Sequence, residues 1–197
     1  MKTVLIIFNL IVVPMVLSNP IDEIPFIQDK NLFNFFVEIP GGSKEKWEIN
    51  KENGLLELEQ REGKDRIINF LSYPGNYGFI PQTLSGDGDP IDLIDLDESF
   101  PKGEIKQVKI IGAIYFEDNK EIDYKFIGVS PNGSFKKVNS IEEMLLEKPA
   151  LLEILKLWFL SYKQPGKMEF IRFIQKEESI KILNKSHLRW SEKQKGE

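Results

Sequence analysis

The sequence predicts an α+β fold in which a small β-barrel is flanked by helices. Short segments rich in aromatic and β-branched residues occupy the chain from about residue 32 to residue 129. Helical signals appear only after residue 139, and strands followed by helices are typical of α+β domains. The chain has 197 residues, 41% apolar and 29% charged. This composition indicates one compact domain and excludes a repeat array or a chain disordered throughout.

Short strands are expected in the first two thirds of the chain. The segment LFNFFVEI at residues 32–39 is aromatic and β-branched and stops at a proline-glycine turn. The next strand alternates in polarity, which places Lys46 and Glu48 on one face. The strands expected from such patterns are Leu32–Ile39, Lys46–Asn50, Leu55–Leu58, Arg66–Leu71, Ile91–Leu96, Gln107–Phe116 and Tyr124–Val129.

Two other segments have no strand pattern. Ile21–Lys30 is interpreted as a lead-in, because Pro20 and Pro25 oppose a helix there. Asn76–Gly78 is interpreted as a simple turn.

Helices are expected in the C-terminal third. Ser140 and Glu143 form a capping-box pattern, and Pro149 suits the first position of a helix running to about Tyr162. Another helix is expected from about Glu177 to Trp190. An apolar stripe indicates packing against the core, with a subunit interface as the alternative; it consists of Leu151, Leu152, Ile154, Leu155, Trp158 and Phe159.

The N-terminus is typical of an export signal. A positive start, Met1-Lys2, precedes the apolar run Val4–Val13, and Val16 and Ser18 suit the positions before a cleavage site. We therefore predict a signal peptide at residues 1–18 and a domain at residues 19–197. The protein would be exported, periplasmic or secreted, with no stable membrane partner after cleavage. An uncleaved membrane anchor or a buried strand is the alternative, although the run is short for a bilayer span.

Composition restricts the chemistry of the chain. Cysteine is absent, which excludes disulfides, thiolate catalysis and zinc–thiolate sites. The single histidine, His187, cannot build a polyhistidine metal site and is interpreted as a surface helix residue. The net charge is −5, but residues 87–123 hold 11 acidic residues against 4 lysines. This acidic centre disfavours nucleic-acid binding and is typical of a site for hard cations.

Three aspartates, Asp87, Asp89 and Asp92, lie within six residues of one another. Converging carboxylates raise one another's pKa and destabilise a fold unless cations neutralise them, so the pattern indicates bound metal. An EF-hand loop is excluded, since Ile91 stands where an oxygen ligand is needed. Taken alone, the segment also fits an acidic surface loop.

A second acidic turn spans residues 117–123. It offers Asp118 and Asp123, and Lys125 follows on the same strand face as Asp123. Taken alone, this turn would be a solvated hairpin.

Together, these segments resemble one protein family. DGDPIDLI at residues 87–94 is similar to the aspartate signature of the family I soluble inorganic pyrophosphatases, and the resemblance extends, with gaps, from about Phe35 to Phe170. GKDRIINFLSYPGNYGF and YKQPGKMEF are most similar to an exported bacterial branch. The supporting segments are VEIP at 37–40, KWE at 46–48, NYGFIPQT at 76–83, EDNKEIDYK at 117–125 and WFLSYK at 158–163. The resemblance implies a small closed OB-like β-barrel with flanking C-terminal helices, which hydrolyses inorganic pyrophosphate to two orthophosphates.

The resemblance also implies roles for the acids. Asp89 corresponds to the carboxylate that orients and deprotonates the attacking water. Glu38 corresponds to an acid that reaches metal through water, and Glu48 to an active-site acid of less separable role. The direct metal ligands would be Asp87, Asp92 and Asp123 for one ion, and Asp118 with Asp123 for ions that arrive with substrate.

The expected cofactor is Mg²⁺, bound as several ions. Mg²⁺ prefers hard oxygen ligands, which fits a site made of Asp and Glu. Mn²⁺ and Zn²⁺ are the expected substitutes.

Basic and tyrosine residues would bind the phosphates. In the family, such groups match Lys46, Arg66, Lys125, Tyr162 and Lys163, while Tyr77, with Tyr73 nearby, matches a tyrosine of the pocket. Arg61 is the alternative to Arg66, because this chain has an insertion between Gly54 and Tyr73 relative to shorter bacterial relatives.

Two other functions fit parts of the pattern. A non-catalytic β-barrel module that binds divalent cations would share the acids but would not need the phosphate-binding cations. An OB-type oligonucleotide binder would need a basic face with stacking aromatics, and the acidic centre argues against it. The chain could also form a homo-oligomer, although no interface is identifiable from the sequence.

Overall fold

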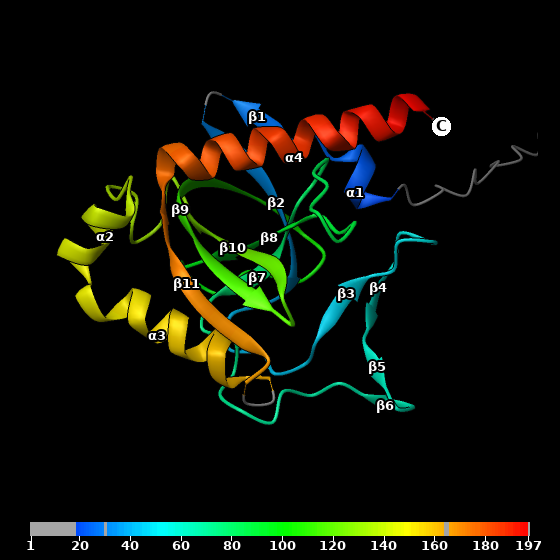
Figure 1. The fold of residues 1–197 in the computed structure, drawn as a ribbon, viewed down its shortest axis with the longest axis horizontal. Helices are drawn as coiled ribbons and strands as arrows, with labels where there is room; N and C mark the ends of the chain where they lie inside the picture. The colour runs from blue at the N-terminus through cyan, green and yellow to red at the C-terminus, as the bar shows by residue number, and fades with distance from the viewer. Residues whose placement is uncertain (1–18, 30, 164–165, 197) are drawn as a thin grey trace, which may run out of the picture.

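The computed structural model describes residues 19–29, 31–163 and 166–196, so the predicted signal peptide lies outside the described residues. The described part forms a curved sheet flanked by helices (Figure 1). The strands are β1 (Ile27–Asp29), β2 (Leu32–Ile39), β3 (Trp47–Ile49), β4 (Leu56–Leu58), β5 (Gln60–Arg61), β6 (Lys64–Asp65), β7 (Asn76–Ile80), β8 (Ile91–Asp95), β9 (Ile105–Asp118), β10 (Glu121–Val129) and β11 (Met168–Gln175). The helices are α1 (Pro20–Glu23), α2 (Ile141–Glu147), α3 (Pro149–Ser161) and α4 (Lys176–Gly196).

Five strands close into a barrel. β2 pairs with β7, β7 with β8, β8 with β10, β10 with β9, and β9 back with β2. The β8–β10 pair is parallel, and the other four pairs are antiparallel. Besides β10, β9 pairs with two further strands because it is 14 residues long: its first residues pair with β2 and its last with β11. This closed ring confirms the predicted barrel.

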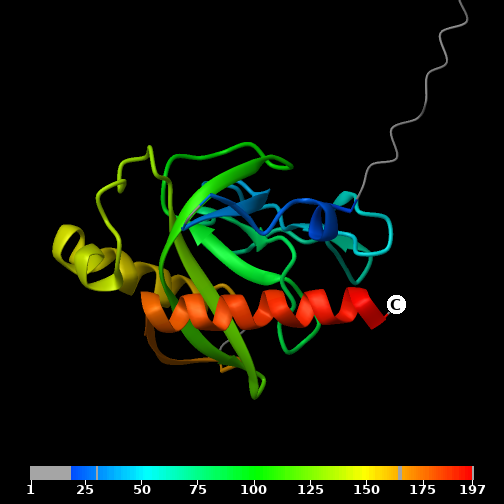
Figure 2. The ribbon, with the colours of Figure 1, turned by 90° about the horizontal axis from the view of Figure 1, so that it is seen from above.

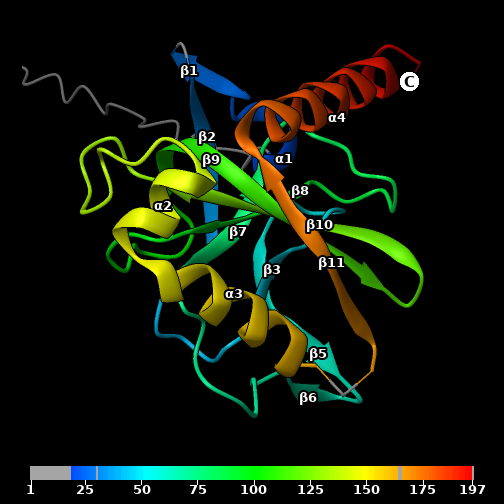
Figure 3. The same ribbon diagram turned by 60° about the vertical axis from the view of Figure 1, so that its left-hand side comes forward.

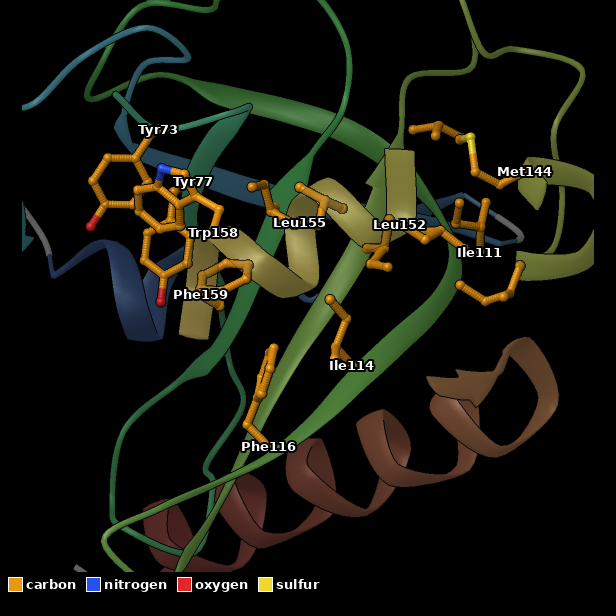
Figure 4. Packing of buried hydrophobic residues seen from close by; sticks show 14 of the residues in the cluster. Tyr73, Tyr77, Ile111, Ile114, Phe116, Met144, Leu152, Leu155, Trp158 and Phe159 are labelled. Carbon is orange, nitrogen blue, oxygen red and sulfur yellow. The ribbon is translucent and has the colours of Figure 1, made fainter. Parts of the chain in front are cut away.

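Helices α3 and α4 lie on opposite sides of the barrel (Figures 1 and 3). Helix α3 starts at Pro149, as predicted, and ends with Tyr162 as its C-cap. Its apolar stripe packs on the sheet through Leu152, Leu155, Trp158 and Phe159, which are all buried (Figure 4). Each such side chain contributes roughly 1.5–3 kcal/mol to folding. Ile154, which the sequence assigned to the same stripe, is 53% exposed.

Three strands of the sheet, β1, β7 and β11, were missed by the sequence patterns. Asn76–Gly78, interpreted as a turn, belongs to β7, which is buried along its whole length. A Cβ at Gly78 would stand 2.0 Å from the carbonyl oxygen of Phe36, so glycine here permits close strand contact. The other two missed strands end the strand order of the sheet: β1 pairs with β2, and β11 pairs with β9.

Two further expectations are wrong. Arg66–Leu71 is not a strand; within it, Ile67 makes an isolated bridge to Glu45. The interpretation of Ile21–Lys30 as a lead-in without helix fails at its start, where Pro20–Glu23 forms α1. Pro20 occupies the first helical position, where no N–H is needed, and the side chain of Asn19 caps the helix.

Helix α4 extends six residues past the predicted end at Trp190, to Gly196, and runs along the barrel (Figure 2). His187 is half-buried, not a surface residue: its ring stacks on Phe26 at 4.2 Å and its Nδ1 lies 2.7 Å from the carbonyl oxygen of Gln82. The backbone N–H of Leu84 donates to the carbonyl oxygen of Ser186. These contacts fix α4 to the segment that leads into the aspartate loop. Among the described residues, no helix is long and apolar enough to cross a membrane.

Candidate active site

One cavity of about 300 Å³ collects the residues that the sequence singled out. All thirteen of them line it: Glu38, Lys46, Glu48, Arg66, Tyr77, Asp87, Asp89, Asp92, Asp118, Asp123, Lys125, Tyr162 and Lys163. Glu121 adds an eighth carboxylate against four cations. The positions therefore agree with the sequence analysis, while the chemical role of each residue stays a prediction.

The barrel strands carry most of the acids into this cavity. Glu38 lies near the end of β2 and Asp92 near the start of β8, while Asp118 ends β9 and Asp123 lies on β10. The two acidic segments, about 30 residues apart in sequence, meet because β8 and β10 are paired in parallel. Asp87 and Asp89 stand in the loop between β7 and β8.

Lys125 lies between these acids and is buried, with 4% of its surface exposed. Its Nζ contacts a carboxylate oxygen of Asp92, lies 2.7 Å from Oδ1 of Asp123 and donates to the Tyr77 hydroxyl at 3.2 Å. Burial by itself lowers the pKa of Lys125, but the negative charge of Asp92 and its other neighbours holds that pKa well above the ordinary value. The ammonium therefore stays charged and neutralises part of the acidic cluster.

The raised pKa values of two acids show that the negative charge of the cluster is energetically unfavourable. Burial raises the pKa of Asp123, and the charge of Asp92 raises it further, while Lys125 opposes this. Burial also raises the pKa of Glu38 to about 7, although the backbone N–H of Ile49 donates to its Oε1 at 2.7 Å. Carboxylates in this state are stabilised by an added cation.

Two cations also line the cavity: Lys46, which precedes β3, and Arg66, which follows β6. Lys46 contacts Glu48, as their shared strand face predicts, and its Nζ lies 3.3 Å from Glu59. Arg66 donates to both carboxylate oxygens of Glu59 at 2.6 Å. Arg61, the alternative to Arg66, lines a neighbouring cavity but not this one. The geometry therefore favours Arg66.

The end of α3 also lines the cavity. Nζ of Lys163 lies 2.5 Å from Oδ2 of Asp118. The ring of Tyr162 stacks on Trp158, with ring centroids 4.7 Å apart. Tyr73 packs on both Tyr77 and Trp158 (Figure 4). Tyr73 does not line the cavity, but it contacts Tyr77, which does.

Besides Glu121, the sequence analysis missed two residues near the site. Lys51, in the turn between β3 and β4, forms an ion pair with Oδ1 of Asp89. Glu59 holds both Lys46 and Arg66 in place. Neither belongs to a segment that resembles the family, and no local sequence pattern indicates their contacts.

The donor chemistry of the cavity fits magnesium. Its oxygen donors are mainly carboxylates, which Mg²⁺ prefers, and the excess of acids over bases favours added positive charge. Among the described residues, no three acidic or histidine side chains already converge at the spacing of metal ligands. Lysines form ion pairs with five of the predicted acids instead: Glu48, Asp89, Asp92, Asp118 and Asp123.

Comparison with known proteins identifies the family. The family model described as inorganic pyrophosphatase matches residues 35–191. The inorganic pyrophosphatase of Candida glabrata is 36% identical over 77% of this chain and 61% of its own length, and that of Homo sapiens is 32% identical over 87% and 68%.

A solved structure agrees with this match. The truncated vacuolar soluble pyrophosphatase of Trypanosoma cruzi, in complex with PPi, superposes with a TM-score of 0.80 at 26% identity. The match covers 87% of this chain and 73% of that one. These relatives are eukaryotic and give no support to the exported bacterial branch. With the shared barrel and the match over residues 35–191, the chain belongs to the inorganic pyrophosphatase family.

Proposed function

We propose that this chain hydrolyses inorganic pyrophosphate to two orthophosphates. The observation that carries the proposal is the single cavity in which eight carboxylates face Lys46, Arg66, Lys125 and Lys163. Family membership and the PPi complex of the Trypanosoma cruzi relative support the same substrate. A polyanion that arrives with divalent cations satisfies both halves of such a cavity at once.

Metal ions would be held by the acids at the centre of the cavity. We assign Asp87, Asp92, Asp118 and Asp123 as direct ligands and Glu38 as a ligand through water. When bound, two Mg²⁺ ions would supply charge neutralisation of the substrate and a lowered pKa for the attacking water. Mn²⁺ and Zn²⁺ are the proposed substitutes.

The chain's own groups would perform the remaining steps. Asp89, which lies on the exposed loop at the cavity edge, would orient the attacking water and accept its proton. Arg66 offers a planar fork to phosphoryl oxygens, while Lys46 and Lys163 act as point charges. Burial keeps the pKa of Tyr77 well above its ordinary value, so its hydroxyl stays protonated and can donate.

Phosphate release tests the proposal directly. With Mg²⁺ present, the purified protein should release two equivalents of orthophosphate from each pyrophosphate, because the acids need a cation to offset substrate charge. Excess chelator should abolish the release, and added Mg²⁺ should restore it. A non-catalytic module would bind Mg²⁺ in a calorimetric titration and release no phosphate, which would overturn the proposal.

Substitution of Asp89 tests the proton acceptor. Asp89→Asn nearly preserves shape but removes a base, so kcat should fall by about 100-fold or more. The side chain of Asp89 is 53% exposed, so the variant should keep its melting temperature. Glu153→Gln, which removes a carboxylate from the exposed surface of α3, is the matched control and should keep full activity. Near-normal turnover of Asp89→Asn would contradict the assigned role.

A pair of arginine variants separates the two candidates for phosphate binding. Arg66→Met should lower kcat/KM about 10- to 100-fold, since a hydrogen bond to a charged group contributes about 1.5–3 kcal/mol. Arg61→Met should change kcat/KM less than twofold, because Arg61 does not line the catalytic cavity. Steady-state kinetics at saturating Mg²⁺ measure both. The reverse order of effects would assign the phosphate contact to Arg61.

We also propose that the protein is exported, as in an exported bacterial branch of the family. The proposal depends on the leader-like composition of residues 1–18. Intact-mass analysis of protein recovered from outside the cytoplasm should give the mass of residues 19–197. Recovery from the cytoplasm alone, with residues 1–18 retained, would contradict export.

A further inference from the structure

A second cavity, of about 460 Å³, lies between α4 and the aspartate loop. Helix α4 contributes Ile182, Lys185, Ser186 and Arg189 to its lining. The opposite wall comes from residues 85–87 and from the β9–β10 hairpin. None of the residues from α4 has a part in the proposed hydrolysis.

The floor of this cavity is apolar. Ile91, Ile122 and Ile182 line it together with Tyr124. Ile122 is 55% exposed although it is a large aliphatic residue, so the cavity holds apolar surface that the fold leaves uncovered. A ligand with an apolar body would bury this surface.

The wall formed by α4 carries polar groups that lack partners. Ser186 is only 1% exposed and its hydroxyl has no hydrogen-bond partner, and the buried Nε–H of Arg189 also has none. Buried polar atoms are normally paired, and an unpaired one costs about 1–3 kcal/mol. In the described part of the chain only two other buried side-chain atoms are unpaired, one oxygen each of Asp95 and Asp97.

These unpaired groups on α4 are of one electrostatic kind. The hydroxyl of Ser186 and the Nε–H of Arg189 can both donate, and Lys185 adds a second positive charge on the same wall. Neither Lys185 nor Arg189 forms a salt bridge with any described residue. Donors and cations without partners favour an anion.

We propose that this cavity binds a small amphipathic anion, a phosphate, phosphonate or carboxylate carried on an apolar or aromatic body. The anionic head would lie against Lys185 and Arg189 and would reach the buried hydroxyl of Ser186 and the Nε–H of Arg189 through a small side-chain movement, while the body would cover the isoleucines. Asp87 and Glu121 line the other side of the cavity and would repel an anion, which fixes the orientation of the head toward α4.

The cavity is connected to the catalytic one through shared residues. Ser85, Asp87, Ile91 and Glu121 are among the residues that line both. Ser186 accepts the backbone N–H of Leu84, and the next residue, Ser85, donates its hydroxyl to Oδ1 of Asp87 at 2.9 Å. A ligand in this cavity would therefore contact the loop that carries Asp87 and Asp89.

Calorimetric titration with phenylphosphonate, in chelator and without divalent metal, tests the proposal. The full-length protein should bind it saturably, and inorganic phosphate, which lacks the apolar body, should bind at least tenfold more weakly. Arg189→Met should weaken phenylphosphonate binding about tenfold or more, since one charge-assisted hydrogen bond is lost. Lys193→Met, from an exposed position on the same helix that does not line the cavity, should bind like the unmodified chain.

Ser186→Ala separates a loss of binding from a folding defect. Removal of an unpaired buried hydroxyl should leave the melting temperature unchanged or raise it, while phenylphosphonate binding weakens severalfold. Lys163→Met, in the catalytic cavity, should leave this binding intact. Absence of saturable binding would overturn the proposal. So would binding that is lost in Lys163→Met but unchanged in Ser186→Ala and Arg189→Met, because the probe would then occupy the catalytic cavity.

Discussion

The acidic site depends on the buried ammonium of Lys125, which extends from β10 and forms ion pairs with Asp92 of β8 and Asp123 of β10. The parallel pairing of these strands places Phe126 beside Leu93, and therefore Lys125 beside Asp92. The ammonium lies against both Asp92 and Asp123, and removal of one partner from such a buried pair costs about 3–5 kcal/mol. The fold can therefore hold these acids close together before any metal binds.

Barrel closure then brings the remaining groups to the same place. Glu38 reaches the cavity because β2 pairs with β7 on one edge and β9 on the other. Gly78 allows β7 to approach β2 closely, because it has no side chain. The hydroxyl of its neighbour Tyr77 accepts a hydrogen bond from Lys125. The apolar face of helix α3 packs on the sheet. This packing places Tyr162 and Lys163, at the end of the helix, in the lining of the cavity.

The sequence predicts the site better than the strands that build it. The thirteen predicted site residues occur in short segments with a distinctive order of charges, and they line one cavity despite the errors in secondary structure. β7 was missed because Asn76 and Gly78 favour turns locally, whereas the close contact with Phe36 that requires glycine is a tertiary property. Lys51 and Glu59 were missed because their contacts with Asp89 and Arg66 cross between elements. Local patterns carry no information on such pairings.

The docking of α4 is the clearest case of a tertiary property with functional meaning. Its sequence predicts a helix, but nothing local indicates that His187 stacks on Phe26 or that Ser186 receives the N–H of Leu84. Docking of this kind normally selects residues that satisfy every buried polar atom. Here the same turn of helix that is held by these contacts leaves Ser186 and Arg189 unpaired beside an apolar floor. Packing alone does not require a serine and an arginine there, and the anion that we propose would give both groups a partner.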